Sequence, residues 1–228
     1  MATILLLETS TDCCSAAICK DGSIIAKTAD SIPKVHAARL VPMAASLLEQ
    51  TGTGTAGIDA VAVSGGPGSY TGLRVGVSTA KGLCFGAGVP LISVETMDIL
   101  VAEGMESGEN PDFIVPFIDA RRMEVYSAVY RNDGSRISEV EAVILDRDSY
   151  SSILEQGKTL FIGTGVEKFA QVCIHPNARF KECFPLAQYM AGKATDAYEK
   201  KKFEDTAYFE PFYLKDFKPG ISKKSPLL

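Results

Sequence analysis

The chain opens with short apolar runs that are separated by turn residues. The runs at residues 3–8, 14–20 and 23–28 each predict a strand. Asp21-Gly22 stands between the second and third runs, and Asp-Gly between two alternating runs favours a tight hairpin. We therefore expect a three-stranded antiparallel meander at the start of the chain.

Segments with a helical spacing of apolar residues then alternate with short strands. The helix expected at residues 36–50 contains Pro42, which should kink it or mark its first turn. The elements expected next are a strand at 59–64, a helix at 70–86, a strand at 90–94 and a helix at 95–105. This order is that of the ribonuclease-H-like layout shared by actin, Hsp70 and sugar kinases, although a fold alone does not fix a function.

A polar, turn-rich stretch at residues 103–111 marks a domain boundary. We expect residues 1–105 to form one ribonuclease-H-like subdomain, residues 106–217 a smaller one, and residues 218–228 a tail. The elements expected in the second subdomain are strands at 113–118, 124–130, 139–144 and 159–163, and helices at 149–156, 167–173 and 186–202.

The most distinctive segment is rich in glycine. An apolar run at residues 61–64 leads into Gly65-Gly66-Pro67-Gly68-Ser69 and then directly into the second helix. Glycines let the backbone approach another group closely, and the free N–H groups at a helix start can hold an anion. The segment matches neither G-x-x-x-x-G-K-[ST] nor G-x-G-x-x-G. Spacing alone therefore leaves an anion-binding loop and a packing loop both open.

Composition and charge narrow the class of protein. Of the 228 residues, 46% are hydrophobic and 22% charged, which is typical of a globular protein with a substantial core. The net charge of −5 argues against an autonomous nucleic-acid binder. The six cysteines form no C-x-x-C motif, the first residues lack the basic stretch of a signal peptide, and no apolar run has the length of a membrane span. We therefore expect a cytoplasmic protein with free thiols and no membrane partner.

Four motifs resemble those of the TsaB (YeaZ) family, which takes part in making N6-threonylcarbamoyladenosine in bacterial tRNA. They lie, in the family's order, at residues 7–12, 66–83, 119–126 and 211–215. Together they span nearly the whole chain, and the glycine-rich segment is the most specific of them.

The resemblance implies an α/β protein with the actin-like (ASKHA) two-lobed fold, in which mixed sheets are flanked by helices. It implies a non-catalytic subunit that binds and activates a TsaD-like catalytic paralogue. A TsaE-like ATPase would join the assembly, and tRNA would be reached through the complex. Alone, such a chain would pair with a second copy of itself. Whether the chain is an enzyme by itself is left open, and no catalytic residue is assigned.

The same resemblance implies which helix faces meet the partner. The residues assigned to this interface are Leu40, Met43, Ala44 and Leu47 on the first helix and Leu73, Val77, Ala80 and Lys81 on the second. The competing interpretation is burial against the protein's own sheet, which we prefer for Val41 and Leu48.

A further set of residues forms a candidate nucleotide site between the lobes. The set consists of Thr9, Ser10, Thr11 and Asp12 in the first turn, Asp119 after a later strand, and Gly163 and Gly165 in a strand-to-helix turn. By resemblance to the actin-like superfold, the ligand would be ATP or ADP with Mg²⁺, and an autonomous phosphotransferase or ATPase is the alternative function. Ordinary turn chemistry explains the same residues, and Arg121 and Arg122 would then form ion pairs.

The sequence offers little for metal or nucleophilic catalysis. TsaD proteins carry an H-x-x-x-H pair at a helix start, and we place Thr96 and Leu100 at the corresponding positions. The two histidines, His36 and His175, are far apart and neither has a second histidine four residues away. With no G-x-S-x-G motif either, we expect no metal, no metal-dependent peptidase and no Ser-His-Asp enzyme.

Overall fold

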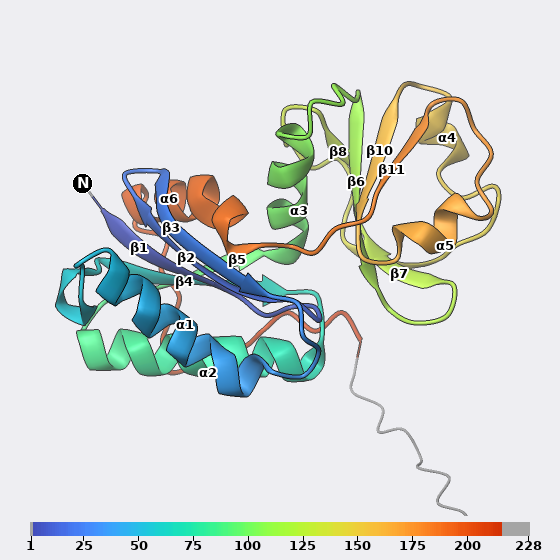
Figure 1. Cartoon of the computed structure of the whole chain (residues 1–228). Coiled ribbons are helices and arrows are strands. Elements are labelled where there is room, and N and C mark those ends of the chain that lie inside the picture. The colour runs from blue at the N-terminus through green and yellow to red at the C-terminus, as the bar shows by residue number, and fades with distance from the viewer. Residues whose placement is uncertain (1, 216–228) are drawn as a thin grey trace, which may run out of the picture.

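The computed structural model describes residues 2–215, which form two mixed sheets side by side (Figure 1). The first sheet has five strands in the order β3-β2-β1-β4-β5. These strands are β1 (Thr3–Glu8), β2 (Cys14–Lys20), β3 (Ser23–Asp30), β4 (Ala60–Gly66) and β5 (Leu91–Glu95).

The first three strands form the predicted meander. β1 pairs antiparallel with β2, and β2 with β3. The turn between β2 and β3 places Asp21 at φ 52° and Gly22 at φ 80°, and two successive positive φ angles are what a two-residue type I′ hairpin requires. β4 and β5 extend the sheet in parallel, and α1 (His36–Gln50) and α2 (Tyr70–Ala87) supply the crossovers that parallel strands need. A short 3-10 turn, η1 (Thr55–Gly57), precedes β4.

Both faces of the first sheet are covered by helices. α1 and α2 lie on one face, while the 3-10 turn η2 (Ala187–Met190) and α6 (Ala191–Glu199) lie on the other (Figure 1). Successive side chains of a strand point to opposite faces, so Leu5 packs in the core under α1 and α2, whereas Ile4 packs with η2 and α6.

The second sheet follows the order β11-β10-β6-β7-β9, with β8 paired to β6. Its strands are β6 (Phe113–Asp119), β7 (Glu124–Ser127), β8 (Tyr130–Arg131), β9 (Glu141–Ile144), β10 (Thr159–Gly163) and β11 (Ala178–Lys181). β6, β10 and β11 run parallel, and β7 and β9 continue the sheet antiparallel. The short helices α4 (Ser151–Leu154) and α5 (Val166–Ala170) pack on one face through an aromatic core that includes Phe161 and Phe169.

α3 (Thr96–Met105) lies between the two sheets and is buried on both sides (Figure 1). Ile99 packs into the core of the first sheet, whereas Met97, Leu100 and Val101 pack against the second. Because its apolar side chains pack into the cores of both lobes, α3 ties the two lobes together.

Parts of the second half differ from the sequence-based prediction. The strand expected at 124–130 is interrupted after Ser127, and β8 turns back to pair with β6. β11 was not expected, because it is a short edge strand in which only Ala178 is buried and no apolar alternation marks it.

The helix expected at 186–202 divides into η2 and α6, and it packs on the first sheet although it follows the second in sequence. Met190 and Ala194 carry the apolar face that binds it there. The sequence predicts that residues 106–217 form the second subdomain, but residues 187–215 pack on the first lobe. Lys215 also contacts the second lobe, through Glu124. The expected tail at 218–228 lies outside the described residues.

Candidate functional site

The glycine-rich loop between β4 and α2 packs against the turn that follows β1. The Ser69 backbone N–H donates to the Ser10 carbonyl oxygen at 2.7 Å. A Cβ added at Gly68 would collide with the carbonyl oxygen of Ser10, and one at Gly72 with that of Thr9. These glycines permit close packing of one backbone on another, so the structure favours the packing interpretation of the loop.

The turn after β1 is closed by the same contacts. Thr9 and Ser10 have no exposed surface, Thr11 is 8% exposed, and Asp12 is exposed. The Thr9 hydroxyl donates to the carbonyl oxygen of Gly72 at 2.8 Å. A phosphate cannot contact buried hydroxyls in this arrangement. Of the four first-lobe residues expected to bind a nucleotide, Asp12 alone is accessible.

Glu8, the last residue of β1, is fully buried beside this turn. Its Oε1 accepts a hydrogen bond from the Ser10 N–H at 2.5 Å, and its Oε2 has no partner within residues 2–215. Burial raises the pKa of Glu8 to about 7, although hydrogen bonds from Ser10 and Ser64 act in the opposite direction. The sequence predicted no role for this carboxyl, because an apolar run does not show whether the acidic residue at its end is buried.

The second-lobe candidates lie together at the carboxyl ends of β6 and β10. Asp119 Oδ1 lies 2.5 Å from Lys168 Nζ, and the Asp119 N–H donates to the Thr164 hydroxyl at 3.1 Å. A Cβ at Gly165 would lie 3.5 Å from Asp119, whereas one at Gly163 would collide with the backbone of β6. No hydrogen bond or ion pair within residues 2–215 joins this group to the turn after β1.

The two arginines after Asp119 do not form the expected ion pairs in the described part of the chain. The Asp119 carboxylate forms its ion pair with Lys168 instead. Arg121 and Arg122 are exposed and both have positive φ angles, 74° and 52°. Asp119 Oδ1 also accepts the Arg121 N–H at 2.5 Å, which stabilises this tight turn between β6 and β7.

Neither histidine sits in a cluster of ligands. His36 begins α1, and its Nε2 lies 2.8 Å from the carbonyl oxygen of Thr11, to which it donates. His175 Nδ1 accepts a hydrogen bond from the backbone N–H of Asn177 at 3.2 Å. Thr96 and Leu100 are both fully buried. Within residues 2–215, no three His, Cys, Asp or Glu side chains are grouped as metal ligands would be.

Seven of the eight residues expected at a partner interface lie inside the protein. All seven are at most 7% exposed: Leu40, Met43, Ala44, Leu47, Leu73, Val77 and Ala80. All but Leu73 pack in the core between α1, α2 and the first sheet, and the Leu73 side chain lies beside Gly66 of β4. Lys81 is partly exposed. These apolar side chains recur at the spacing that points them toward the sheet, so they form the core and do not form a surface.

The outward faces of the same helices are exposed, and their charged residues are Arg39 and Glu49 on α1 and Arg74 and Lys81 on α2. Leu48 is buried, as expected, but Val41 is 50% exposed, contrary to its assignment to the protein's own sheet. On α1 it is flanked by the exposed Ala38 and Ala45, and on α2 Phe85 is 88% exposed. Val41 and Phe85 are thus exposed apolar side chains on two helices that contact each other.

The chain after α6 runs back along the first lobe as a strap, residues 204–215. The Glu204 N–H donates to the Leu91 carbonyl at 2.9 Å, and the Phe212 N–H donates to that of Gly65 at 2.7 Å. Lys215 then forms an ion pair with Glu124 of β7 at 2.5 Å. The strap therefore joins β5, the glycine-rich loop and the second lobe, an arrangement that sequence periodicity cannot reveal.

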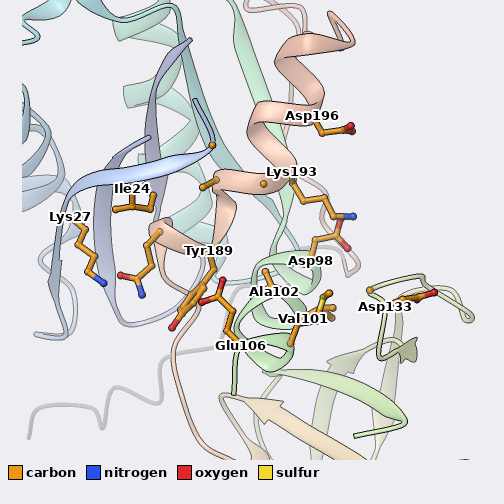
Figure 2. Close-up of a pocket in the computed structure, with 16 residues that line it drawn as sticks. Ile24, Lys27, Asp98, Val101, Ala102, Glu106, Asp133, Tyr189, Lys193 and Asp196 are labelled. Carbon is orange, nitrogen blue, oxygen red and sulfur yellow. The ribbon is translucent and has the colours of Figure 1, made fainter. Parts of the chain in front are cut away.

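Two of the hollows on the surface of the described residues lie beside α2 or α3. The larger, about 1000 Å³, lies between the β2–β3 hairpin, α3, α6 and the turn at 133–134. Figure 2 shows Lys193 of α6 and Asp98 of α3 facing each other across it, and they form an ion pair at 3.2 Å. The smaller hollow, about 310 Å³, lies between α2 and the strap. No residue of the predicted nucleotide site lines either hollow.

Comparison with known proteins places the chain in a family. The family profile described as "TsaD: tRNA N6-adenosine threonylcarbamoyltransferase" matches residues 24–216. The tRNA threonylcarbamoyladenosine biosynthesis protein TsaB of Escherichia coli K12 is 31% identical over 220 residues, which cover 93% of this chain and 94% of that protein. The chain belongs to the TsaB (YeaZ) family.

Solved structures agree with this TsaB assignment. YeaZ from Pseudomonas aeruginosa superposes with a TM-score of 0.81 at 28% identity, covering 94% of this chain and 100% of that one. The activator of 2-hydroxyisocaproyl-CoA dehydratase from Clostridium difficile, solved with bound ADPNP, reaches a TM-score of 0.51 at 12% identity, covering 89% of this chain and 98% of its own. This second likeness concerns the fold alone. The expected actin-like α/β fold with two mixed sheets is confirmed.

None of the helices in residues 2–215 combines the length and the apolar character that crossing a bilayer requires.

Proposed function

We propose that this TsaB-family chain is a non-catalytic subunit in the biosynthesis of N6-threonylcarbamoyladenosine in tRNA, and that it binds and activates a TsaD-like catalytic subunit. The name of its Escherichia coli relative supports the pathway, and the match to the TsaD profile supports a common origin with the partner. The observation that carries the proposal is the docking face, which we define as the outward surface of α1 and α2.

The docking face has the chemistry of a helix-pairing surface. The segment of α1 from residue 40 to residue 48 contains no charged side chain, and Val41 and Ala45 are exposed on it. Ala38 is exposed one turn earlier, beside Arg39. Small residues on a helix surface let a second helix approach closely, and Phe85 on α2 offers a large apolar contact. The buried residues Leu40 and Leu47 support this face from beneath.

The proposal includes the other expected partners. Without its partner, the chain would pair with a second copy of itself through the docking face. A TsaE-like ATPase would join the assembled pair, and tRNA would be contacted through the complex, in keeping with the net charge of −5. For this role in tRNA modification, we propose that the chain acts in the cytoplasm.

The alternative function is an autonomous phosphotransferase or ATPase that uses ATP or ADP with Mg²⁺. It would require the turn at Thr9, Ser10 and Thr11 to open, because all three residues are buried and α2 and the glycine-rich loop pack on Thr9 and Ser10. Calorimetric titration of the isolated chain with Mg-ATP distinguishes the two functions. Saturable binding that Asp12→Asn abolishes would favour the alternative.

Size-exclusion chromatography with light scattering tests the docking face. The chain is mixed with the TsaD-like protein of the same organism, and Val41→Glu and Phe85→Glu are compared with the wild type. We expect a 1:1 complex that both variants weaken at least 10-fold, because each places a charge in an apolar contact. Ile174→Glu is the matched control, since Ile174 is 97% exposed but lies on the second lobe. Equal binding by all four proteins would rule out the docking face.

A further inference from the structure

The smaller hollow borders the docking face along α2. It has a volume of about 310 Å³, and Arg74, Ser78 and Lys81 of α2 face Glu210 and Tyr213 of the strap across it. Pockets for small molecules range from about 300 to 1,000 Å³. This hollow lies at the lower limit, so its size suits one side chain of a docked protein better than a nucleotide.

Arg74 is held in a fixed orientation at one end of the hollow. Its guanidinium carbon lies 4.2 Å from the centroid of the Tyr70 ring, and its Nε donates to the Tyr213 hydroxyl at 3.3 Å. The two tyrosine rings contact each other with centroids 5.0 Å apart. The terminal Nη1 and Nη2 atoms of Arg74 make no hydrogen bond within residues 2–215. An oriented guanidinium with two unused nitrogens presents the fork that matches a carboxylate.

Lys81 stands about two turns further along the same face of α2, roughly 10 Å away along the helix axis. Its Nζ donates to the Ala207 carbonyl oxygen at 3.0 Å, which uses one of its three N–H groups. Neither Arg74 nor Lys81 forms an ion pair in the described part of the chain. Glu210 is the one acidic residue that lines the hollow, so its lining carries a net positive charge.

We propose that this hollow binds a carboxylate side chain, Asp or Glu, on the surface of the TsaD-like partner. The inference rests on the proposed function, because the hollow continues the docking face and the same partner would cover both. Arg74 binds the carboxylate through its two terminal nitrogens, and Lys81 adds a second positive charge. Glu210 opposes binding, because its negative charge lowers the potential at the same place. The pairing orients the partner on the docking face.

Affinity measurements with the full-length chain and the TsaD-like protein test this proposal. Arg74→Ala should weaken binding roughly 10-fold or more, since a hydrogen bond to a charged group is lost. Arg74→Lys should restore only part of the loss, because an ammonium group lacks the planar fork. Glu210→Gln should tighten binding about 2-fold to 5-fold by removing the opposing charge. Lys27→Ala is the control, an exposed lysine on β3.

Salt dependence separates a carboxylate contact from a merely structural role of Arg74. The wild-type affinity should fall as salt is raised, and that of Arg74→Ala should fall less steeply. Tyr213→Phe removes the hydroxyl that positions Arg74 but keeps the charge of Arg74. The salt dependence of its binding should therefore lie between that of the wild type and that of Arg74→Ala. The proposal is overturned if Arg74→Ala binds within 2-fold of the wild type, or if Glu210→Gln weakens binding. A complex that Val41→Glu disrupts but Arg74→Ala does not would refute this inference alone, whereas no complex at all would refute the proposed function.

Discussion

Substitutions at two adjacent residues of α1 should distinguish an effect on stability from an effect on partner binding. Leu40 has no exposed surface and packs in the core between the helices and the first sheet, whereas the next residue, Val41, is 50% exposed. Truncating a buried leucine to alanine costs about 2–5 kcal/mol, because transfer energy is lost and a cavity remains. Truncating a half-exposed valine costs less than about 1 kcal/mol.

These costs convert into separate shifts in melting temperature. For a domain of 150–250 residues, 1 kcal/mol corresponds to roughly 2–4 °C. We therefore expect Leu40→Ala to lower the melting temperature by roughly 4–20 °C and Val41→Ala by less than about 4 °C. Binding to the TsaD-like protein should show the reverse order. Val41→Ala should weaken it about 5-fold, which is roughly 1 kcal/mol, and folded Leu40→Ala should bind almost normally.

Thermal melting followed by circular dichroism, with affinity measured well below the melting temperature of both variants, provides the assay. The reasoning fails if Val41→Ala destabilises the chain as much as Leu40→Ala does. It also fails if Leu40→Ala loses binding while its melting temperature stays unchanged, because Leu40 would then act on the surface.

Two further predictions concern the turn after β1. In a urea titration, Gly72→Ala should lower the free energy of unfolding by about 1–3 kcal/mol, because the new methyl group would collide with the Thr9 carbonyl. Gly82→Ala is the control: it lies on the same helix with open space around it, and it should be neutral or stabilising. Glu8 has a pKa raised from 4.5 to about 7, so between these values the folded state binds more protons than the unfolded state and stability falls as pH rises. The loss should amount to about 3 kcal/mol between pH 4.5 and pH 7.5. Glu8→Gln should remove this part of the pH dependence, and an unchanged slope in the variant would show that Glu8 is not the titrating group.

The sequence predicts local structure best where one signal dominates. Asp21-Gly22 predicted the first hairpin, and the bounds of α1 agree with its apolar periodicity. The sequence did not predict β11, because this strand forms by pairing with β10 and its own residues have no alternation of apolar and polar positions. The return of α6 to the first lobe depends on a distant apolar face, which no local pattern encodes.

Prediction of the candidate site was limited by periodicity itself. The spacing of Leu40, Met43 and Leu47 identifies an apolar face, but the same spacing serves a core and an interface equally. Only the observed burial shows that these residues face inward and that Val41 faces outward. For Thr9 and Ser10, the chemistry of the residue types suggested phosphate binding, whereas the packing of Gly68 and Gly72 seals them.

Hydrogen–deuterium exchange of the chain, alone and with the TsaD-like protein, tests the central claim most directly. If α1 and α2 dock the partner, backbone amides of these helices and of residues 207–213 of the strap should exchange more slowly in the complex, while those of β9 and β11 should not change. Protection confined to the second lobe, with α1 and α2 unaffected, would contradict the account.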